Sequence, residues 1–266
     1  MTVKHYFSIL LILAILTSCN ENTKEDSIYE PLLDSLYVGL IELYEDYNEV
    51  ASPTPSLAFT TKTIYPCVNY SVVHETLQYG NNIIVDIKGI YIENICLTAL
   101  GPAIGRSFVG LKNGEYQLMI RYNSVTDRYT ITVTDSLLIM VDEQRSFTAN
   151  PQPPWTRYPE NSFVYLCGTT NETEWIYEDF LDTLTSNLNI EEFTISENAY
   201  MGYPHQPAGH YVDHPSRFFH YENESILLAA EELLKKYAVN IISQYQGVGI
   251  QIISWDNRRY YSWMYY

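Results

Sequence analysis

The feature that most constrains the fold of this chain is a proline cluster, Pro151-Gln152-Pro153-Pro154. Three prolines in four residues cannot continue a helix or the interior of a sheet, because proline lacks a backbone N–H and its ring fixes φ. The residue pattern also changes here, from alternating polar and apolar residues to a mixture of helical and strand patterns. The cluster therefore predicts a boundary between two domains.

Residues 56–145, before this boundary, have the pattern of short strands. Runs rich in Val, Ile, Tyr and Thr are separated by turn residues such as Lys112-Asn113-Gly114 and Thr126-Asp127. β-Branched and aromatic residues favour the pleated, half-buried surface of a sheet. Repeated short strands with this spacing predict an Ig-like β-sandwich of about seven strands.

Residues 27–50 are expected to form one acidic helix. Ser27, followed three residues later by Glu30, makes a capping-box pattern. Apolar residues then recur in steps of three and four, at Leu33, Leu36, Leu40, Leu43 and Tyr47. Such a stripe predicts a helix that packs against the rest of its own chain. An alternative is that this helix docks the protein, as a structural subunit, into an assembly of the cell envelope.

Residues 155–266, after the boundary, are expected to form a C-terminal α/β (α+β) domain, so that the whole protein mixes α and β structure. Strands are predicted at 162–167, 190–195, 239–242, 249–255 and 259–265, and helices at 172–188 and 225–237. A loop is predicted over 201–222. Ordered loops of this length are often functional.

The first residues have the build of a secretory signal. Lys4 and His5 precede an apolar run that ends in Leu16-Thr17-Ser18-Cys19. The run is too short for the ~20 residues that span a bilayer as a helix. A basic start, a short apolar stretch and small residues before a cleavage point predict an exported protein.

Leu16-Thr17-Ser18-Cys19 resembles the lipobox of bacterial lipoproteins. The resemblance implies that residues 1–18 are a signal peptide, that the chain is cleaved before Cys19, and that the thiol of this cysteine carries a lipid. Residues 19–26 would then be a lipidated tether. Their acidic composition resembles the export signals of Bacteroidetes surface lipoproteins, which implies an outer-membrane anchor and exposure at the cell surface.

The charge of the chain is strongly negative. From residue 20 onward, 14 Lys and Arg stand against 32 Asp and Glu, a net charge of −18. Such a chain repels phosphate backbones, so we expect no nucleic-acid partner. It also repels anionic lipid headgroups, so we expect the N-terminal lipid, rather than a basic patch, to attach the protein to the membrane.

Export permits disulfides. With Cys19 lipidated, three cysteines remain, and at least one of them must be unpaired within the chain. We expect Cys67 and Cys96 to pair, because both fall in the predicted strand-rich domain. Cys167 would then be a free thiol, buried in a strand. Its place between a strand and a helix leaves open the alternative of a reactive nucleophile.

Four histidines fall between residues 205 and 220. His205, His210 and His214, with Asp213, could hold zinc and leave an open position for a water that attacks a substrate. The prolines of this segment argue against a helix that would stack two of the imidazoles, and the His-Glu-x-x-His motif is missing. We therefore expect no cofactor and interpret the histidines as incidental. A zinc-dependent hydrolase is the alternative.

Aromatic residues gather at the C-terminus. Trp255, Tyr261, Trp263 and Tyr265 could form a platform for a sugar or a peptide, because their rings combine apolar faces with polar tips. A closing strand would also use such residues for packing. The sequence thus predicts a lipid-anchored binding or interaction protein of the cell envelope that is not an enzyme, with a glycan or an envelope protein as its partner.

Overall fold

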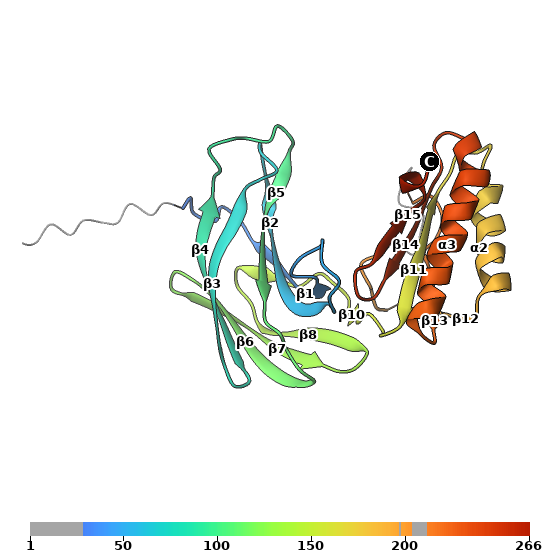
Figure 1. Cartoon of the computed structure of the whole chain (residues 1–266). Coiled ribbons are helices and arrows are strands. Elements are labelled where there is room, and N and C mark those ends of the chain that lie inside the picture. Colours follow the sequence, from blue (N-terminus) through green and yellow to red (C-terminus); the bar gives the residue numbers. More distant parts are fainter. Residues whose placement is uncertain (1–28, 197, 204–211) are drawn as a thin grey trace, which may run out of the picture.

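The computed structural model describes residues 29–196, 198–203 and 212–266. Within these ranges the chain forms two β-sheets, and two helices cover the second sheet on the side away from the first (Figure 1). The predicted mixture of α and β structure is confirmed, and it is rich in strands.

The first sheet has the strand order β10-β8-β7-β6-β4-β3-β5-β2-β1-β9. Its members are β1 (Leu36–Leu43), β2 (Thr54–Tyr65), β3 (Ser71–Tyr79), β4 (Asn82–Tyr91), β5 (Gly101–Phe108), β6 (Gly114–Tyr122), β7 (Val125–Val133), β8 (Leu137–Gln144), β9 (Thr148–Ala149) and β10 (Trp155–Thr156). The sheet therefore reaches beyond residues 56–145 in both directions along the chain.

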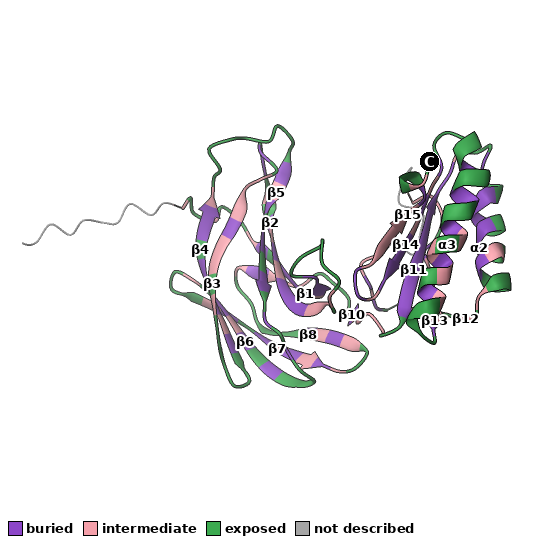
Figure 2. Cartoon of the chain, viewed as in Figure 1, coloured by how far each residue is buried: buried purple, intermediate pink, exposed green. Residues whose placement is uncertain are grey.

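This sheet curls around a single core. β3 and β5 are joined by one residue pair only, Ser71 with Ile104, so the sheet can bend there and bring its two halves face to face. Most buried residues of the core come from β1 to β8, whose buried positions Figure 2 shows, and Trp155 of β10, Val109 and Leu111 complete it. Phe59 and Tyr129 are fully enclosed. The predicted sandwich of about seven strands is thus, in the described residues, one continuous curled sheet of ten.

The predicted acidic helix over residues 27–50 is wrong for the part that the structure describes, because β1 lies there. Leu36, Val38 and Leu40 are buried at a spacing of two, with exposed fractions of 0, 1 and 5%. The ends of the predicted stripe are at the surface, with Leu33 70% and Tyr47 42% exposed. Pairing with β2 along the whole strand overrides the local helical pattern.

The second sheet is antiparallel throughout, in the order β12-β13-β11-β14-β15. Its strands are β11 (Ser162–Gly168), β12 (Ile190–Phe193), β13 (Arg217–Tyr221), β14 (Gly249–Ser254) and β15 (Arg259–Tyr261), and its helices are α2 (Trp175–Asn187) and α3 (Glu224–Asn240). Both helices bury apolar residues against one face of this sheet, among them Phe180 and Leu234.

Three predicted elements of this region differ from the structure. The strand predicted over 259–265 ends at Tyr261, and the 3₁₀ helix η2 (Ser262–Met264) follows it. β13 lies inside the segment 201–222 that was predicted to be a loop. Phe218 and Phe219 pack on opposite faces of the sheet, so this strand shows no polar–apolar alternation, and Pro215 just before it suggests a loop. Residues 239–242, predicted as a strand, instead end α3 and begin the short 3₁₀ helix η1 (Ile242–Gln244).

The connection between β1 and β2, residues 44–53, contacts the second sheet. The hydroxyl of Tyr44 donates to the carbonyl of Trp255 at 2.9 Å. The side-chain amide of Asn257 donates to the carbonyl of Glu49, also at 2.9 Å. Each of these hydrogen bonds joins the connection after β1 to the segment after β14, so together they hold the two sheets against each other.

A buried carboxylate fixes the chain just after the proline cluster. Glu42, 3% exposed, accepts hydrogen bonds from Nε of Arg157 at 2.8 Å and from the backbone N–H of Tyr158 at 2.7 Å. Burial raises the pKa of this carboxyl, although both hydrogen bonds and the charge of Arg157 oppose the shift. The link between the sheets is therefore held by β1, a strand more than a hundred residues away in sequence.

The predicted disulfide between Cys67 and Cys96 is confirmed, with the two Cα atoms 5.2 Å apart. It joins the connection after β2 to the connection after β4. Cys167 is a buried free thiol in β11. Cys19 and the predicted signal peptide lie outside the described residues. Neither α2 nor α3 has the length and apolar character that a membrane-crossing helix needs.

Candidate ligand-binding site

One end of the second sheet brings together segments that are distant in sequence. β11 ends at Gly168, which pairs with Gly249 at the start of β14. The turn into α2, the segment after α3 and the C-terminus all lie at this same end, at the top of the second sheet in Figure 1. We call it the upper end of the second sheet.

The upper end contains an open hollow of about 420 Å³, lined by Thr170, Asn171, Glu172, Thr173, Tyr245 and Gln246. This volume is in the range of small-molecule sites. The lining offers hydroxyl and amide groups, which both donate and accept hydrogen bonds, and one carboxylate, which accepts them. Within the turn, the hydroxyl of Thr173 accepts from the backbone N–H of Thr170 at 2.9 Å, which fixes its shape.

Aromatic rings lie at the upper end on both faces of the second sheet. Trp175, 46% exposed, meets Tyr245 edge to face with ring centroids 6.0 Å apart. Trp263, also 46% exposed, stacks on Tyr261 at 4.7 Å and lies over Gly249. A Cβ at this glycine would come within 3.2 Å of the Trp263 ring, so the close approach depends on glycine. Trp175 and Tyr245 therefore border the hollow, whereas Trp263 lies on the face of the sheet that carries no helix, because Gly249 alternates with Ile250, which packs under the helices.

The aromatic residues predicted to bind a ligand separate into two groups. Tyr261 and Trp263 lie at the upper end, and Tyr265 lies near them, its hydroxyl donating to Glu231 of α3 at 3.2 Å. Trp255 is instead partly buried against the core of the second sheet, and its backbone contacts Tyr44 of the first sheet. Tyr261 and Trp263 are therefore candidates for ligand contact, whereas Tyr265 packs against the core of the second sheet and Trp255 holds the two sheets together.

Asp213 and His214 form a cluster with Thr169, next to the upper end. Asp213 accepts from the backbone N–H and the hydroxyl of Thr169, at 2.9 and 3.0 Å. Nε2 of His214 is 2.9 Å from the same hydroxyl, and its ring stacks on Tyr177 with centroids 4.2 Å apart. Thr169 is 3% exposed, so this cluster buries its hydroxyl and fastens the chain after β11 to the segment before β13.

The other two predicted zinc ligands, His205 and His210, lie outside the described residues. Within the described residues, no three His, Cys, Asp or Glu side chains come close enough together to hold a metal ion. Asp213 and His214 already contact Thr169, so a metal there would have to compete with these hydrogen bonds.

Cys167 has the properties of a core side chain. It is 0% exposed, and burial raises the pKa of its thiol to about 12, with the nearby charge of Asp213 acting in the same direction. A thiol with so high a pKa is almost fully protonated near neutral pH, and the thiolate is the reactive form. The structure therefore does not support a nucleophilic role for Cys167.

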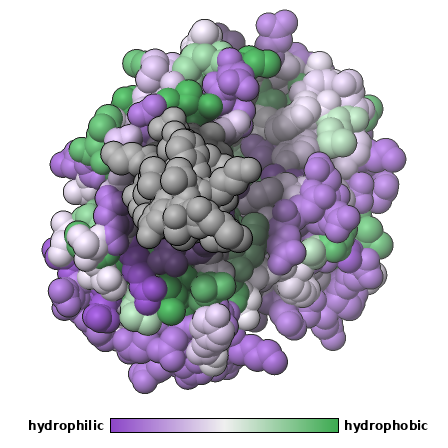
Figure 3. Space-filling view, turned by 90° about the vertical axis from the view of Figure 1, so that its left-hand side faces the viewer, coloured by the Kyte–Doolittle hydropathy of each residue, from purple (hydrophilic) through white to green (hydrophobic). Residues whose placement is uncertain are grey.

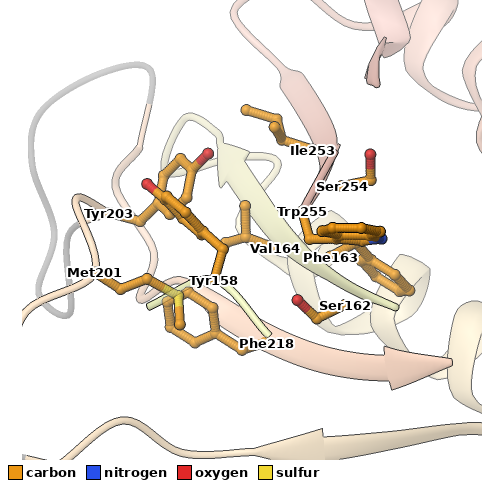
Figure 4. A pocket seen from close by; sticks show the side chains of 10 residues that line it. All are labelled: Tyr158, Ser162, Phe163, Val164, Met201, Tyr203, Phe218, Ile253, Ser254 and Trp255. Atoms are coloured by element: carbon orange, nitrogen blue, oxygen red, sulfur yellow. The ribbon is translucent and has the colours of Figure 1, made fainter. Parts of the chain in front are cut away.

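A second hollow lies on the face of the second sheet that carries no helix (Figure 4). Tyr158 and Tyr203 stand together over β11, with ring centroids 6.0 Å apart, and Met201 and Phe218 close the other side. Its volume of about 10 Å³ is near the room that a single water needs. This hollow is packing space between the tyrosines rather than a ligand site.

Sequence reasoning missed Trp175, Tyr245 and the polar lining of the hollow. Trp175 is one of the apolar residues of the helix predicted over 172–188, but it begins α2 with its ring 46% exposed. No local signal marks Tyr245 or residues 170–173, because they come together only when β11 and β14 pair.

Comparison with known proteins identifies no relative: no protein-family model, curated protein or solved structure matches the chain.

Proposed function

We propose that this chain is a lipid-anchored binding protein of the bacterial cell envelope, held at the outer membrane through Cys19, and that the upper end of its second sheet binds a glycan. The proposal rests on one observation: an open polar hollow bordered by Tyr245 and the exposed ring of Trp175, at the same end of the sheet as the exposed ring of Trp263. The protein has no catalytic role in this proposal.

The chemistry of the site suits a sugar. A sugar ring has an apolar C–H face, which an exposed indole can cover, and hydroxyl groups around its edge, which amides and hydroxyls can bind. Asn171, Gln246 and the hydroxyl of Thr170 supply such groups at the hollow, whereas the hydroxyl of Thr173 is buried and bonded within the turn. Sites for small ligands usually combine aromatic surface with a small number of polar groups.

Charge narrows the class of glycan. Glu172 lines the hollow, Glu178 lies in the first turn of the adjoining helix, and residues 151–266 carry 15 acidic and 6 basic residues. An anionic sugar would be repelled at such a surface. The ligand is therefore a neutral or amino sugar rather than a uronic acid or a sulfated glycan.

The test is a glycan array probed with residues 20–266, followed by titration calorimetry with the sugars it selects. Trp263→Ala and Trp175→Ala are each expected to weaken binding roughly tenfold or more, as aromatic anchors commonly do. Tyr79→Ala is the matched control, because Tyr79 is a 65% exposed ring on the first sheet. The affinity of Tyr79→Ala for the selected sugar is expected to equal that of the wild type.

Two results would count against the proposal. One is that no neutral or amino sugar binds. The other is that Tyr79→Ala weakens binding as much as the tryptophan variants, because the loss would then not come from the upper end. Thermal melting of each variant shows whether it is folded.

The lipid anchor has its own test. Cys19→Ala is expected to move the protein from the membrane fraction to the soluble fraction and to abolish labelling by a radioactive fatty acid. Cys67→Ala in the same cells is the control and should keep both the label and the location. Unchanged labelling of Cys19→Ala would remove the anchor from the proposal.

A further inference from the structure

The disulfide holds together two connections at one end of the first sheet, and this end carries large apolar side chains on its surface. They are Ile64, Val68, Ile92, Ile95, Leu97 and Leu100, with exposed fractions of 58, 41, 41, 77, 55 and 78%. We call these six residues the apolar tip. Their clustering is notable because folded proteins seldom expose so many neighbouring apolar groups without a partner.

The apolar tip is an ordered surface rather than a loose loop. The side-chain amide of Asn69 donates to the carbonyl of Ile95 at 2.7 Å, and its side-chain oxygen accepts from the backbone N–H of Leu97 at 3.2 Å. The Cys67–Cys96 disulfide lies between these contacts. The apolar side chains are therefore held outward by covalent and hydrogen-bonded structure.

The charge of the apolar tip differs from that of the rest of the molecule. Residues 62–70 and 91–101 contain one base, Lys62, and one acid, Glu93. The chain as a whole has a net charge of −17. Anionic lipid headgroups repel acidic side chains, and the apolar tip carries few of them. This end of the protein can therefore approach a membrane with the least electrostatic repulsion.

The N-terminal chain also starts beside the apolar tip. Glu30 forms two backbone hydrogen bonds with Ile90, at 2.9 and 2.8 Å, two residues before Ile92. The chain leaves the first sheet at the end of β4, below the connections that carry the apolar tip (Figure 1). In the view of Figure 3, hydrophobic residues appear around this point of departure and toward the upper margin of the face. The chain takes ten residue steps from Cys19 to Tyr29, which can span at most ~33–36 Å.

From this arrangement we infer that the apolar tip is a membrane-contact surface, which inserts its exposed isoleucine and leucine side chains into the headgroup region of a bilayer. The occupant is lipid rather than a protein groove-binder, because five of the six side chains project from connecting segments at one end of the sheet, and the sixth, Ile64, lies at the end of β2. Apolar area inserted at the interface supplies the affinity. A chain anchored near this end would then stand with its second sheet away from the membrane.

The inference is tested without the lipid anchor, so its outcome is independent of Cys19. Every strand and helix described lies within residues 29–266, and residues 20–266 therefore retain both cores. Co-sedimentation with phosphatidylcholine vesicles is compared for the wild type, for Ile95→Ser/Leu100→Ser, and for Val141→Ser/Leu228→Ser. The last pair is the matched control, 56 and 47% exposed and outside the apolar tip.

We expect the wild type to bind these vesicles and Ile95→Ser/Leu100→Ser to lower the partition coefficient roughly tenfold or more. The control pair should stay within about twofold of the wild type, and phosphatidylglycerol in the vesicles should weaken binding. Absence of vesicle binding, or equal losses in both double variants, would overturn the inference. A third contradicting result is that the wild type forms dimers in sedimentation equilibrium, the Ile95→Ser/Leu100→Ser variant does not, and neither protein binds vesicles. The apolar tip would then be a self-association surface.

Discussion

Removal of the Cys67–Cys96 disulfide is expected to destabilise the first sheet by an amount that follows from the sequence separation. The two cysteines are 29 residues apart. In the chain-entropy model, a cross-link over a loop of this length reduces the entropy of the unfolded chain by about 12 cal/mol/K, which is about 3–4 kcal/mol at 25 °C. For a chain of this size, such a change lowers Tm by about 6–16 °C.

The assay is urea unfolding of the wild type, with and without reductant, beside Cys67→Ala/Cys96→Ala. The reduced wild type and the double variant should lose similar free energies of unfolding, and reductant should not affect the double variant, because Cys167 has no disulfide partner. A loss below about 1 kcal/mol would refute the reasoning. The cross-link would then not restrict the unfolded chain as the loop length requires.

Two further predictions concern buried ionisable groups. Burial raises the pKa of Glu42, so folding favours the protonated form of this carboxyl. The stability that this protonated form contributes is full below the pKa of the carboxyl in the unfolded chain, and it is lost as pH rises through the pKa in the folded protein. Glu42→Gln should therefore flatten the pH dependence of unfolding above the ordinary glutamate range, and an unchanged slope would contradict this. Cys167, with its thiol pKa raised to about 12, should resist iodoacetamide in the native protein near neutral pH and react fully in urea, as measured by mass spectrometry. Rapid labelling of the native thiol would contradict the burial.

The strands of the first sheet could be predicted where their residues alternate locally, as in β6 and β7. β1 could not, because its leucines fit a helical stripe as well as a strand. Leu36, Val38 and Leu40 become a strand through pairing with β2, a contact between segments that local periodicity does not report. The short strands β9 and β10 likewise exist only because β1 and β8 are there to pair with them.

The candidate site was predictable only in part. The C-terminal aromatic cluster indicated Trp263 and Tyr261, because several large rings fall within a few residues of one another there. The hollow at the same end depends on the order of strands in the second sheet, which places the turn after Gly168 next to Gly249. Trp175 shows the same limit, since its place on an apolar stripe does not reveal that the helix begins at the surface.

The apolar tip illustrates why composition alone misleads. Ile92, Ile95 and Leu97 follow a buried strand and have the composition of a core segment. Their exposure follows from the disulfide and from Asn69, which turn this segment outward. The pairing of Cys67 with Cys96 could be predicted, but the surface that it creates could not.

The proposed glycan site can be examined most directly through the four tryptophans of the chain. Their indole N–H resonances are followed by NMR while residues 20–266 are titrated with the sugar that the array selects. The resonances of Trp175 and Trp263, which are exposed at the upper end, should shift in a saturable way, whereas those of Trp155 and Trp255, which pack within the structure, should stay in place. Shifts confined to Trp155 and Trp255, or no shift at saturating sugar, would contradict a glycan site at the upper end of the second sheet.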